Sequence, residues 1–164
     1  MKKPKPLAAF NSPFELGVRM VYLLNSLQPV GADLQKLVLL DYAVVYSDDL
    51  GGPPSLHTPV PYRGSEYLSR RDLIAQSLYL MSTRGLVAVA MDETGITYFA
   101  GDTARTMVGA LTAPYLRELE GRCRWAAATF ATLSSRDMTD KFAQQGHLWG
   151  AEFEDAGARG LAWQ

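Results

Sequence analysis

The residues most suited to chemistry lie in one stretch, LLDYAVVYSDDLGGPPSLHTPVPYRG, at positions 39–64. It begins with an acid, Asp41, among apolar residues, and a histidine, His57, follows in a segment rich in glycine and proline. A carboxylate beside a histidine is a pair that hydrolases use for acid–base catalysis. The same carboxylate would be equally suited to a buried ion pair. Its candidate partners are Arg19, Arg63 and Arg70. We favour the ion pair, because no second carboxylate or histidine is placed to work with Asp41.

The remaining candidates for catalysis or metal binding are isolated. Cys123 is the one cysteine, which excludes an internal disulfide and a cysteine-rich zinc site and is typical of a reducing cytoplasm. Its position on an apolar helical stripe predicts an inert core residue. Asp48 and Asp49 lie near His57, but their spacing defines no metal geometry, and solvated helix-end residues are the simpler interpretation. We find no phosphate-binding glycine loop and no metal-binding histidine pair. The sequence therefore predicts no cofactor, no metal, no small-molecule substrate and no enzyme.

Composition limits the function classes further. The 164 residues are 48% hydrophobic and 20% charged, which is typical of a globular chain with a real core. A net charge of −1 argues against indiscriminate binding to nucleic acid or to an anionic membrane. No apolar run approaches the roughly 18 residues of a membrane helix. The start, MKKPKPLAAF, reads as a flexible basic lead rather than a signal peptide.

Three helices are expected before residue 85. The first follows Ser12, which with Glu15 forms the pattern of a capping box. A second helix is predicted from Asp33 to about Ser47, and a third from about Glu66 to Arg84. The connection between them, at about residues 50–65, is longer than most loops in a compact domain, which indicates either a functional loop or a packed excursion.

A β-hairpin is expected directly after the third helix. Two alternating runs, Leu86–Met91 and Ile96–Ala100, flank the turn sequence Asp-Glu-Thr-Gly. Three helices followed by a hairpin is the order of a winged helix-turn-helix, with the third helix as recognition helix. The predicted fold is mainly α with a small β-hairpin (α+β), in which a winged-helix-like domain is followed by C-terminal helices and a tail.

The C-terminal part is predicted to be helical and then aperiodic. A short helix near 104–111 precedes a longer one from Pro114, whose apolar seam is suited to docking on a domain or on a partner helix. The aromatic residues of the tail suggest a docking segment, although a tail wrapped on its own domain fits equally well; they are Trp149, Phe153 and Trp163. We divide the chain into a lead (1–10), a winged-helix-like domain (11–101), a helical extension (102–148) and a tail (149–164).

A modest basic cluster accompanies the third helix. Arg70 and Arg71 lie in its first part, and Arg63 and Arg84 lie near its two ends; the predicted nucleic-acid-binding residues are Arg70, Arg71 and Arg84. They are candidates for contacts with nucleic-acid phosphates, and solvated charges offset by Glu66 and Asp72 are the alternative.

Several motifs together resemble a known family. The segments FNSPFELGVR, LQKLVLLDYAVVYSDD, GGPPSLHTPVPYRGSEYLSRRDLI, LMSTRGLV and DETGITYFA occur in this order. The series, over about residues 10–135, is similar to the middle components of ABC-three-component systems, which are bacterial conflict operons that include the Lamassu-type anti-phage and anti-plasmid systems. The residues that match the family pattern are Asp41, Tyr42, Ser47, His57, Pro59, Tyr62, Arg63, Arg70 and Arg71.

The resemblance implies a subunit rather than a stand-alone enzyme. The family resemblance points to an adaptor that links an SMC-like ABC ATPase to an effector, often a nuclease. We expect Asp41 to anchor the long loop and the loop's exposed face to bind a partner protein. The predicted partner-binding residues are Asp41, Tyr42, His57, Tyr62, Arg63, Trp149, Phe153 and Trp163. The alternative is a winged-helix DNA-binding transcriptional regulator, which the acids of the hairpin turn, Asp92 and Glu93, disfavour because they would repel phosphates.

Overall fold

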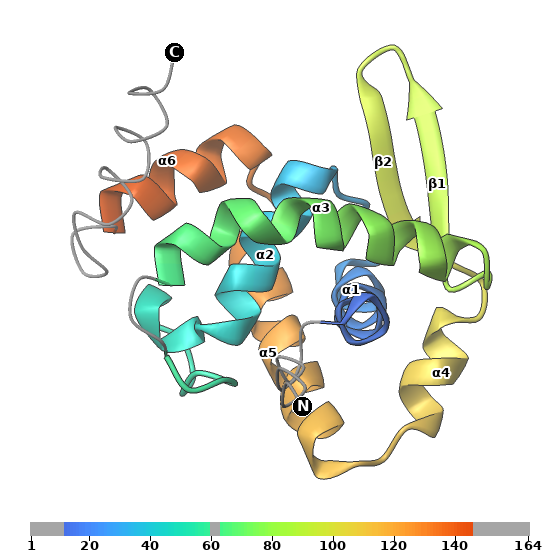
Figure 1. Cartoon of the computed structure of the whole chain (residues 1–164), viewed down its shortest axis with the longest axis horizontal. Helices are drawn as coiled ribbons and strands as arrows, with labels where there is room; N and C mark the ends of the chain where they lie inside the picture. Colours follow the sequence, from blue (N-terminus) through green and yellow to red (C-terminus); the bar gives the residue numbers. More distant parts are fainter. Residues whose placement is uncertain (1–11, 60–62, 146–164) are drawn as a thin grey trace, which may run out of the picture.

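The computed structural model describes residues 12–59 and 63–145 of the chain (Figure 1). Its elements are α1 (Pro13–Leu27), α2 (Leu34–Val45), the short 3-10 helix η1 (Ser47–Leu50), α3 (Arg63–Ser82), β1 (Val87–Asp92), β2 (Gly95–Ala100), α4 (Ala104–Ala110), α5 (Pro114–Phe130) and α6 (Ser135–Gln145). The prediction of a mainly helical chain with one antiparallel hairpin is confirmed. Helix α6 was not predicted as a separate element.

Helix α1 begins where the sequence predicts. The Ser12 hydroxyl accepts a hydrogen bond from the backbone N–H of Glu15 at 3.2 Å, and the Glu15 carboxylate accepts one from the Ser12 backbone at 3.5 Å. This reciprocal pair is the predicted capping box, with Pro13 in the first turn. The cap fixes the entry of a helix that is buried along most of its length.

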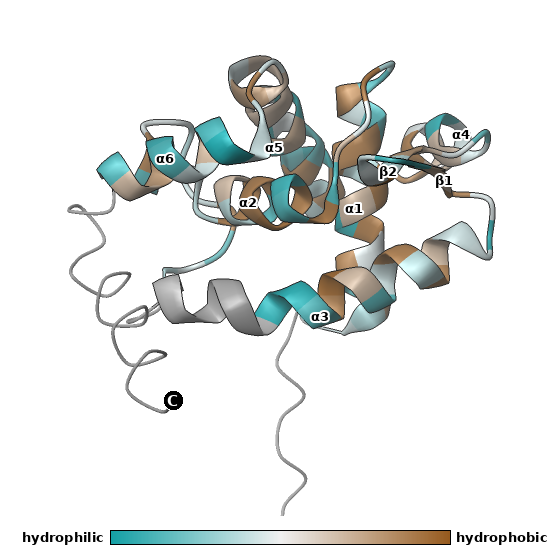
Figure 2. Ribbon diagram, turned by 90° about the horizontal axis from the view of Figure 1, so that it is seen from above, coloured by the Kyte–Doolittle hydropathy of each residue, from teal (hydrophilic) through white to brown (hydrophobic). Residues whose placement is uncertain are grey.

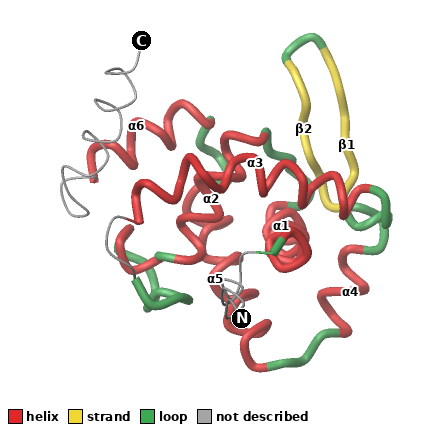
Figure 3. Tube along the Cα trace, in the orientation of Figure 1, coloured by secondary structure: helices red, strands yellow, loops and turns green. Residues whose placement is uncertain are grey.

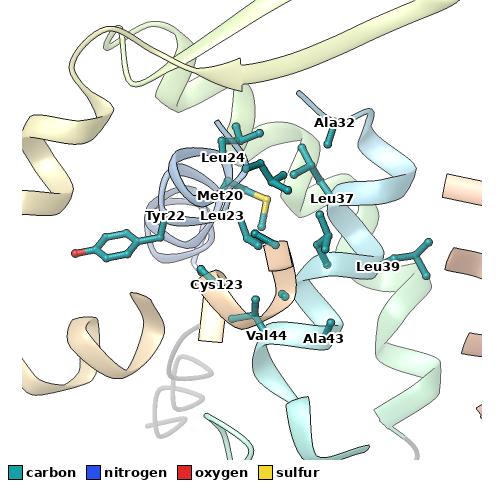
Figure 4. Packing of buried hydrophobic residues seen from close by; sticks show 14 of the residues in the cluster. Met20, Tyr22, Leu23, Leu24, Ala32, Leu37, Leu39, Ala43, Val44 and Cys123 are labelled. Carbon is teal, nitrogen blue, oxygen red and sulfur yellow. The ribbon is translucent and has the colours of Figure 1, made fainter. Parts of the chain in front are cut away.

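Helices α1 and α2 form the middle layer of the molecule. Figure 2 shows them between α3 on one side and α5 with α6 on the other, and much of the ribbon of both helices is brown, that is, apolar. The labelled side chains in Figure 4 come from α1, α2, α5 and the α1–α2 connection, and Cys123 of α5 lies in this cluster. The prediction of an inert core cysteine agrees with its complete burial.

The hairpin projects from the helical body (Figure 3). Its strands pair in the register Val87↔Ala100 to Asp92↔Gly95, which confirms the predicted turn. Ala32, between α1 and α2, exchanges two backbone hydrogen bonds with Tyr98 of β2, at 2.9 and 2.8 Å. This bridge ties the base of the hairpin to the connection between the first two helices.

The C-terminal helices share the core of the first three. Helix α5 presents its predicted seam to α1 and α2, where Leu119, Ala126 and Phe130 are buried. Lys36 of α2 donates hydrogen bonds of 2.7 Å to the carbonyl oxygens of Ala131 and Leu133, just beyond the end of α5. This contact joins α2 to the end of α5, and it is favourable because a cation lies at the negative end of a helix.

Within residues 12–59 and 63–145, no helix is both long enough and apolar enough to cross a membrane.

Candidate functional site

The acid singled out from the sequence is the centre of a buried charge cluster. Asp41 of α2 has no exposed surface, and its carboxylate accepts hydrogen bonds from Arg19 of α1 at 2.9 and 3.1 Å. Arg70 of α3 approaches the same carboxylate at 3.3 Å. Arg19 and Arg70 are themselves only 2% and 8% exposed. The prediction of a buried, paired Asp41 is confirmed, and the cluster joins α1, α2 and α3.

Two arginines around one carboxylate determine its protonation. Burial alone would raise the pKa of Asp41, but the positive charges of Arg19 and Arg70 and the hydrogen bonds from Arg19 hold that pKa below its usual value. Conversely, burial would lower the pKa of Arg19, and the Asp41 carboxylate raises it above the usual value. Asp41 is therefore ionised and fully engaged, which makes it a poor general base.

His57 lies at the edge of this cluster. A 2.7 Å hydrogen bond joins its Nε2 to the hydroxyl of Tyr115 on α5, and the two rings are stacked with centroids 6.0 Å apart. Burial, followed by repulsion from Arg19, lowers the pKa of His57 to about 4. The imidazole is consequently neutral at pH 7 and fixes the loop to α5.

The long connection after α2 is a packed loop, held by both α2 and α5. The Ser47 hydroxyl donates to the carbonyl of Pro53 at 2.9 Å, and Arg122 of α5 donates to that of Pro54 at 2.9 Å. Gly52 lies against the Trp125 ring so closely that a Cβ would come within 2.5 Å of Cε2. The sequence allowed either a functional loop or a packed excursion here, and residues 46–59 form a packed excursion.

Tyr42 takes part in the same arrangement. It is buried, and its hydroxyl donates to Asp49 at 2.7 Å, which fixes η1 against α2. The outer face of the loop is a shallow depression that includes the exposed residues Asp48 and Thr58. Asp41 and Tyr42 thus lie on the inner side of the loop and support it, while its outer residues are exposed to solvent.

The arginines of α3 differ in their surroundings. Arg70 is engaged with Asp41 and lies over the Tyr46 ring, at 5.9 Å from its centroid. Arg71 is exposed and donates to Gln35 at 2.8 Å, and Arg84 is exposed beyond the end of the helix. Of the three predicted nucleic-acid-binding residues, Arg71 and Arg84 face solvent and Arg70 does not.

The other predicted partner-binding residues lie at the start of α3 or outside the described residues. Arg63 is the first residue of α3. Four further residues of the predicted partner surface lie outside the described residues: Tyr62, Trp149, Phe153 and Trp163. In the described part of the chain, no cluster of three or more histidine, cysteine, aspartate or glutamate side chains is arranged to hold a metal ion.

An apolar groove lies between α1, α4 and α5. Its volume is about 530 Å³, and its walls include Phe14, Val18, Met107, Leu111, Leu116 and Leu119. Phe14 and Leu111 are 56% and 39% exposed, so the groove presents large apolar side chains to solvent. The sequence did not indicate this groove, because it forms where α1 packs against α4 and α5, which are distant from α1 in the chain. The available signal was the presence of Phe14 and Leu111 outside the buried helical stripes.

The comparisons with known proteins identify one family. The family model described as ABC-three component (ABC-3C) system Middle Component 2 matches residues 9–152. No curated protein and no solved structure matches the chain.

Proposed function

Because the chain belongs to the middle component 2 family of ABC-three component systems, we propose that it is a non-catalytic adaptor subunit of a bacterial defence complex. In this proposal it links an SMC-like ABC ATPase to an effector, often a nuclease, in a Lamassu-type system that acts against phages or plasmids. The observation that carries the proposal is the family match over residues 9–152, since it makes the chain one component of a multi-component system.

The geometry around Asp41 supports a non-catalytic role. The carboxylate that hydrolytic chemistry would need is fully buried and held by Arg19 and Arg70. The histidine that would accompany it is bonded to Tyr115 instead. These groups stabilise a loop, and a stable, enlarged loop with exposed outer residues is suited to binding a protein.

We further infer a winged-helix domain. The order α1, α2, α3, β1, β2 supports it, as does the Ala32–Tyr98 bridge, which places a third extended segment beside the hairpin between the first two helices. The enlarged α2–α3 connection distinguishes this domain from one with a short turn at that place, and we propose that its outer face is a partner surface.

Co-expression with the ATPase and effector of the same system, followed by affinity capture, tests the proposal. Capture of both components supports it, whereas a chain that stays alone beside an intact ATPase contradicts it. The double variant Asp48→Arg with Thr58→Arg changes only exposed loop residues and is expected to reduce capture. Glu118→Arg, an exposed change on α5, is the matched control and should retain it.

A DNA-binding regulator is the second candidate, favoured by the exposure of Arg71 and Arg84 around α3. It predicts a salt-dependent mobility shift of short duplexes by the isolated chain, weakened by Arg71→Ala with Arg84→Ala. Arg70→Ala is unsuitable for this test, because it leaves Asp41 with one partner fewer in the core. The absence of any shift at low salt would exclude this candidate.

A further inference from the structure

The outer edge of the hairpin carries unused backbone hydrogen-bonding groups. The N–H of Gly101 donates to the carbonyl of Leu86 at 3.0 Å, so these two residues form a hydrogen-bonded pair. Bonded and non-bonded pairs alternate along an antiparallel ladder. Given the observed register, the backbone groups of Ala88 and Ala90 point toward β2, and those of Val89 and Met91 point away from it.

The two edges of the hairpin differ. On β2, the outward groups of Tyr98 bind Ala32 at 2.8 and 2.9 Å, which agrees with this alternation. On β1, the outward groups of Val89 and Met91 make no hydrogen bond with another described residue. One edge of the hairpin is therefore paired within the fold at its base, and the other presents a row of donors and acceptors.

The sequence of β1 gives that edge little protection before Asp92, at the end of the strand. Natural proteins usually block exposed edges with lysine, proline or a bulge. Strand β1, VAVAMD, contains no lysine and no proline, and its register with β2 is continuous. An apolar, unpaired edge of this kind is a template for a further strand.

The same residues also form an apolar face. Directly opposed residues of antiparallel strands point to the same side, so Val89, Met91 and Ile96 share one face of the hairpin. They are 46%, 77% and 45% exposed. A two-stranded hairpin is marginally stable by itself, and a third strand would pair its edge and cover part of this face.

We propose that the β1 edge receives an extended segment of another component of the ABC-three component system, which adds a strand to the hairpin. The segment has apolar side chains at alternate positions and a basic residue where it passes the turn. This inference rests on the proposed adaptor function and assigns a second binding surface to it.

The charge of the turn supports a basic residue in the partner. The charged residues of the hairpin are Asp92 and Glu93, both acidic. Hydrogen bonds from the side chain and backbone of Thr94 hold the pKa of Asp92 below its usual value, so this carboxylate is ionised at neutral pH. Two negative charges favour a basic protein segment and oppose a phosphate backbone.

The position of the hairpin also suits an adaptor. In Figure 1 it extends at the upper right, whereas the loop after α2 lies at the lower left, on the far side of the helical body. Two surfaces so placed would allow the chain to contact two components at once.

Amide hydrogen exchange, resolved by residue, tests the inference on the full chain alone and in complex with the other co-expressed components. We expect the amides of Val89 and Met91 to exchange rapidly in the free chain and to become protected in the complex. The amides of Ala88 and Ala90 are the internal control, because they are bonded to β2 in both states.

Two variants extend this test. Val89→Pro removes an outward donor without removing a bond of the hairpin, and we expect it to weaken binding of the other components about tenfold or more. Val89→Ile keeps the donor and the apolar side chain, and should bind like the wild type. Val89→Pro is informative only if the amides of Ala88 and Ala90 stay protected from exchange in that variant. If they do not, Met91→Lys is used in its place, since a lysine on an edge also opposes strand addition.

The outcomes separate this inference from the adaptor proposal. A complex that forms with Val89 and Met91 still unprotected, or that Val89→Pro and Met91→Lys leave unchanged, overturns the strand addition and leaves the adaptor function standing. Protection in the chain alone, accompanied by a doubled mass, overturns it in favour of pairing between two copies. Failure of any complex to form contradicts the adaptor proposal itself.

Discussion

Asp41, Arg19 and Arg70 come from three different helices, and their charged groups are almost entirely withdrawn from water. Removing an ion from water costs several kcal/mol, and in this cluster the mutual attraction and hydrogen bonds offset that cost. At the scale of single residues, the three members of the cluster therefore differ in what their loss would cost. Loss of Asp41 removes the carboxylate that both buried guanidinium groups share, whereas loss of either arginine leaves Asp41 with the other one.

Asp41→Ala is therefore expected to lower the free energy of unfolding by about 3–5 kcal/mol, because two guanidinium groups lose their shared carboxylate. Urea denaturation followed by circular dichroism measures the change. Asp48→Ala, an exposed acid close in sequence, is the control and should change stability by no more than about 0.5 kcal/mol. Equal effects of the two variants would contradict the role assigned to Asp41.

His57 makes stability depend on pH. The folded chain protonates this residue only below about pH 4, whereas the unfolded chain does so near its usual value of 6.5. Between these values the unfolded state binds more protons, so the free energy of unfolding rises with pH from about 4 to 6.5. Asp41, an acid, also makes the free energy of unfolding rise with pH. Because its pKa is lowered in the folded chain, its contribution to stability is present above the unfolded pKa near 3.9 and is lost as the pH falls below that value.

His57→Gln should accordingly flatten the dependence of stability on pH between 4 and 6.5, and leave the loss at lower pH in place. Urea midpoints at pH 4.5, 5.5 and 7 provide the measurement. His147→Gln, which removes the other histidine of the chain, is the control and keeps the His57–Tyr115 bond. An unchanged slope in His57→Gln would mean that His57 titrates normally in the folded chain.

At the scale of elements, glycine allows the base of the hairpin to close. A Cβ at Gly101 would overlap the backbone carbonyl of Gly85, whereas one at Gly121 on α5 would meet no atom within 4 Å. We expect Gly101→Ala to destabilise the protein, because the backbone of Gly85 must move and the Gly101–Leu86 bond weakens. Gly121→Ala should stabilise it by up to about 1 kcal/mol through helix propensity. Thermal unfolding compares them, and a neutral Gly101→Ala would contradict the close packing.

Elements with strong local signals were predictable, and contacts between distant elements were only partly so. The capping box at Ser12 and the turn at Asp92–Gly95 depend on neighbouring residues, and both were predicted. Asp41 was expected to be paired because an acid on an apolar stripe needs a donor, yet its pairing with both Arg19 and Arg70 depends on how three helices pack. The groove at Phe14 and Leu111 was missed for the same reason, since no local pattern specifies how α1 packs against α4 and α5.

At the scale of the whole molecule, the core contains residues from both sides of the predicted boundary between the winged-helix-like domain and the helical extension. Leu119, Cys123 and Phe130 of α5 are buried in one cluster with residues of α1 and α2. Arg122 and Tyr115 of the same helix hold the loop after α2. Because α5 supplies both core and loop contacts, we expect it to fold together with the helices that precede the hairpin.

A fragment that ends at Gly101 should therefore fail to fold cooperatively, whereas one that ends at Gln145 should unfold in a single transition. The shorter fragment lacks α5 and leaves the apolar surfaces of α1 and α2 that face it in water, at a cost of about 25 cal/mol for each Å². The longer fragment retains every residue of the described core cluster. Near-ultraviolet circular dichroism during heating distinguishes them. A sharp transition in the shorter fragment would establish residues 11–101 as an independent domain, and α5 would then be a helix docked on it.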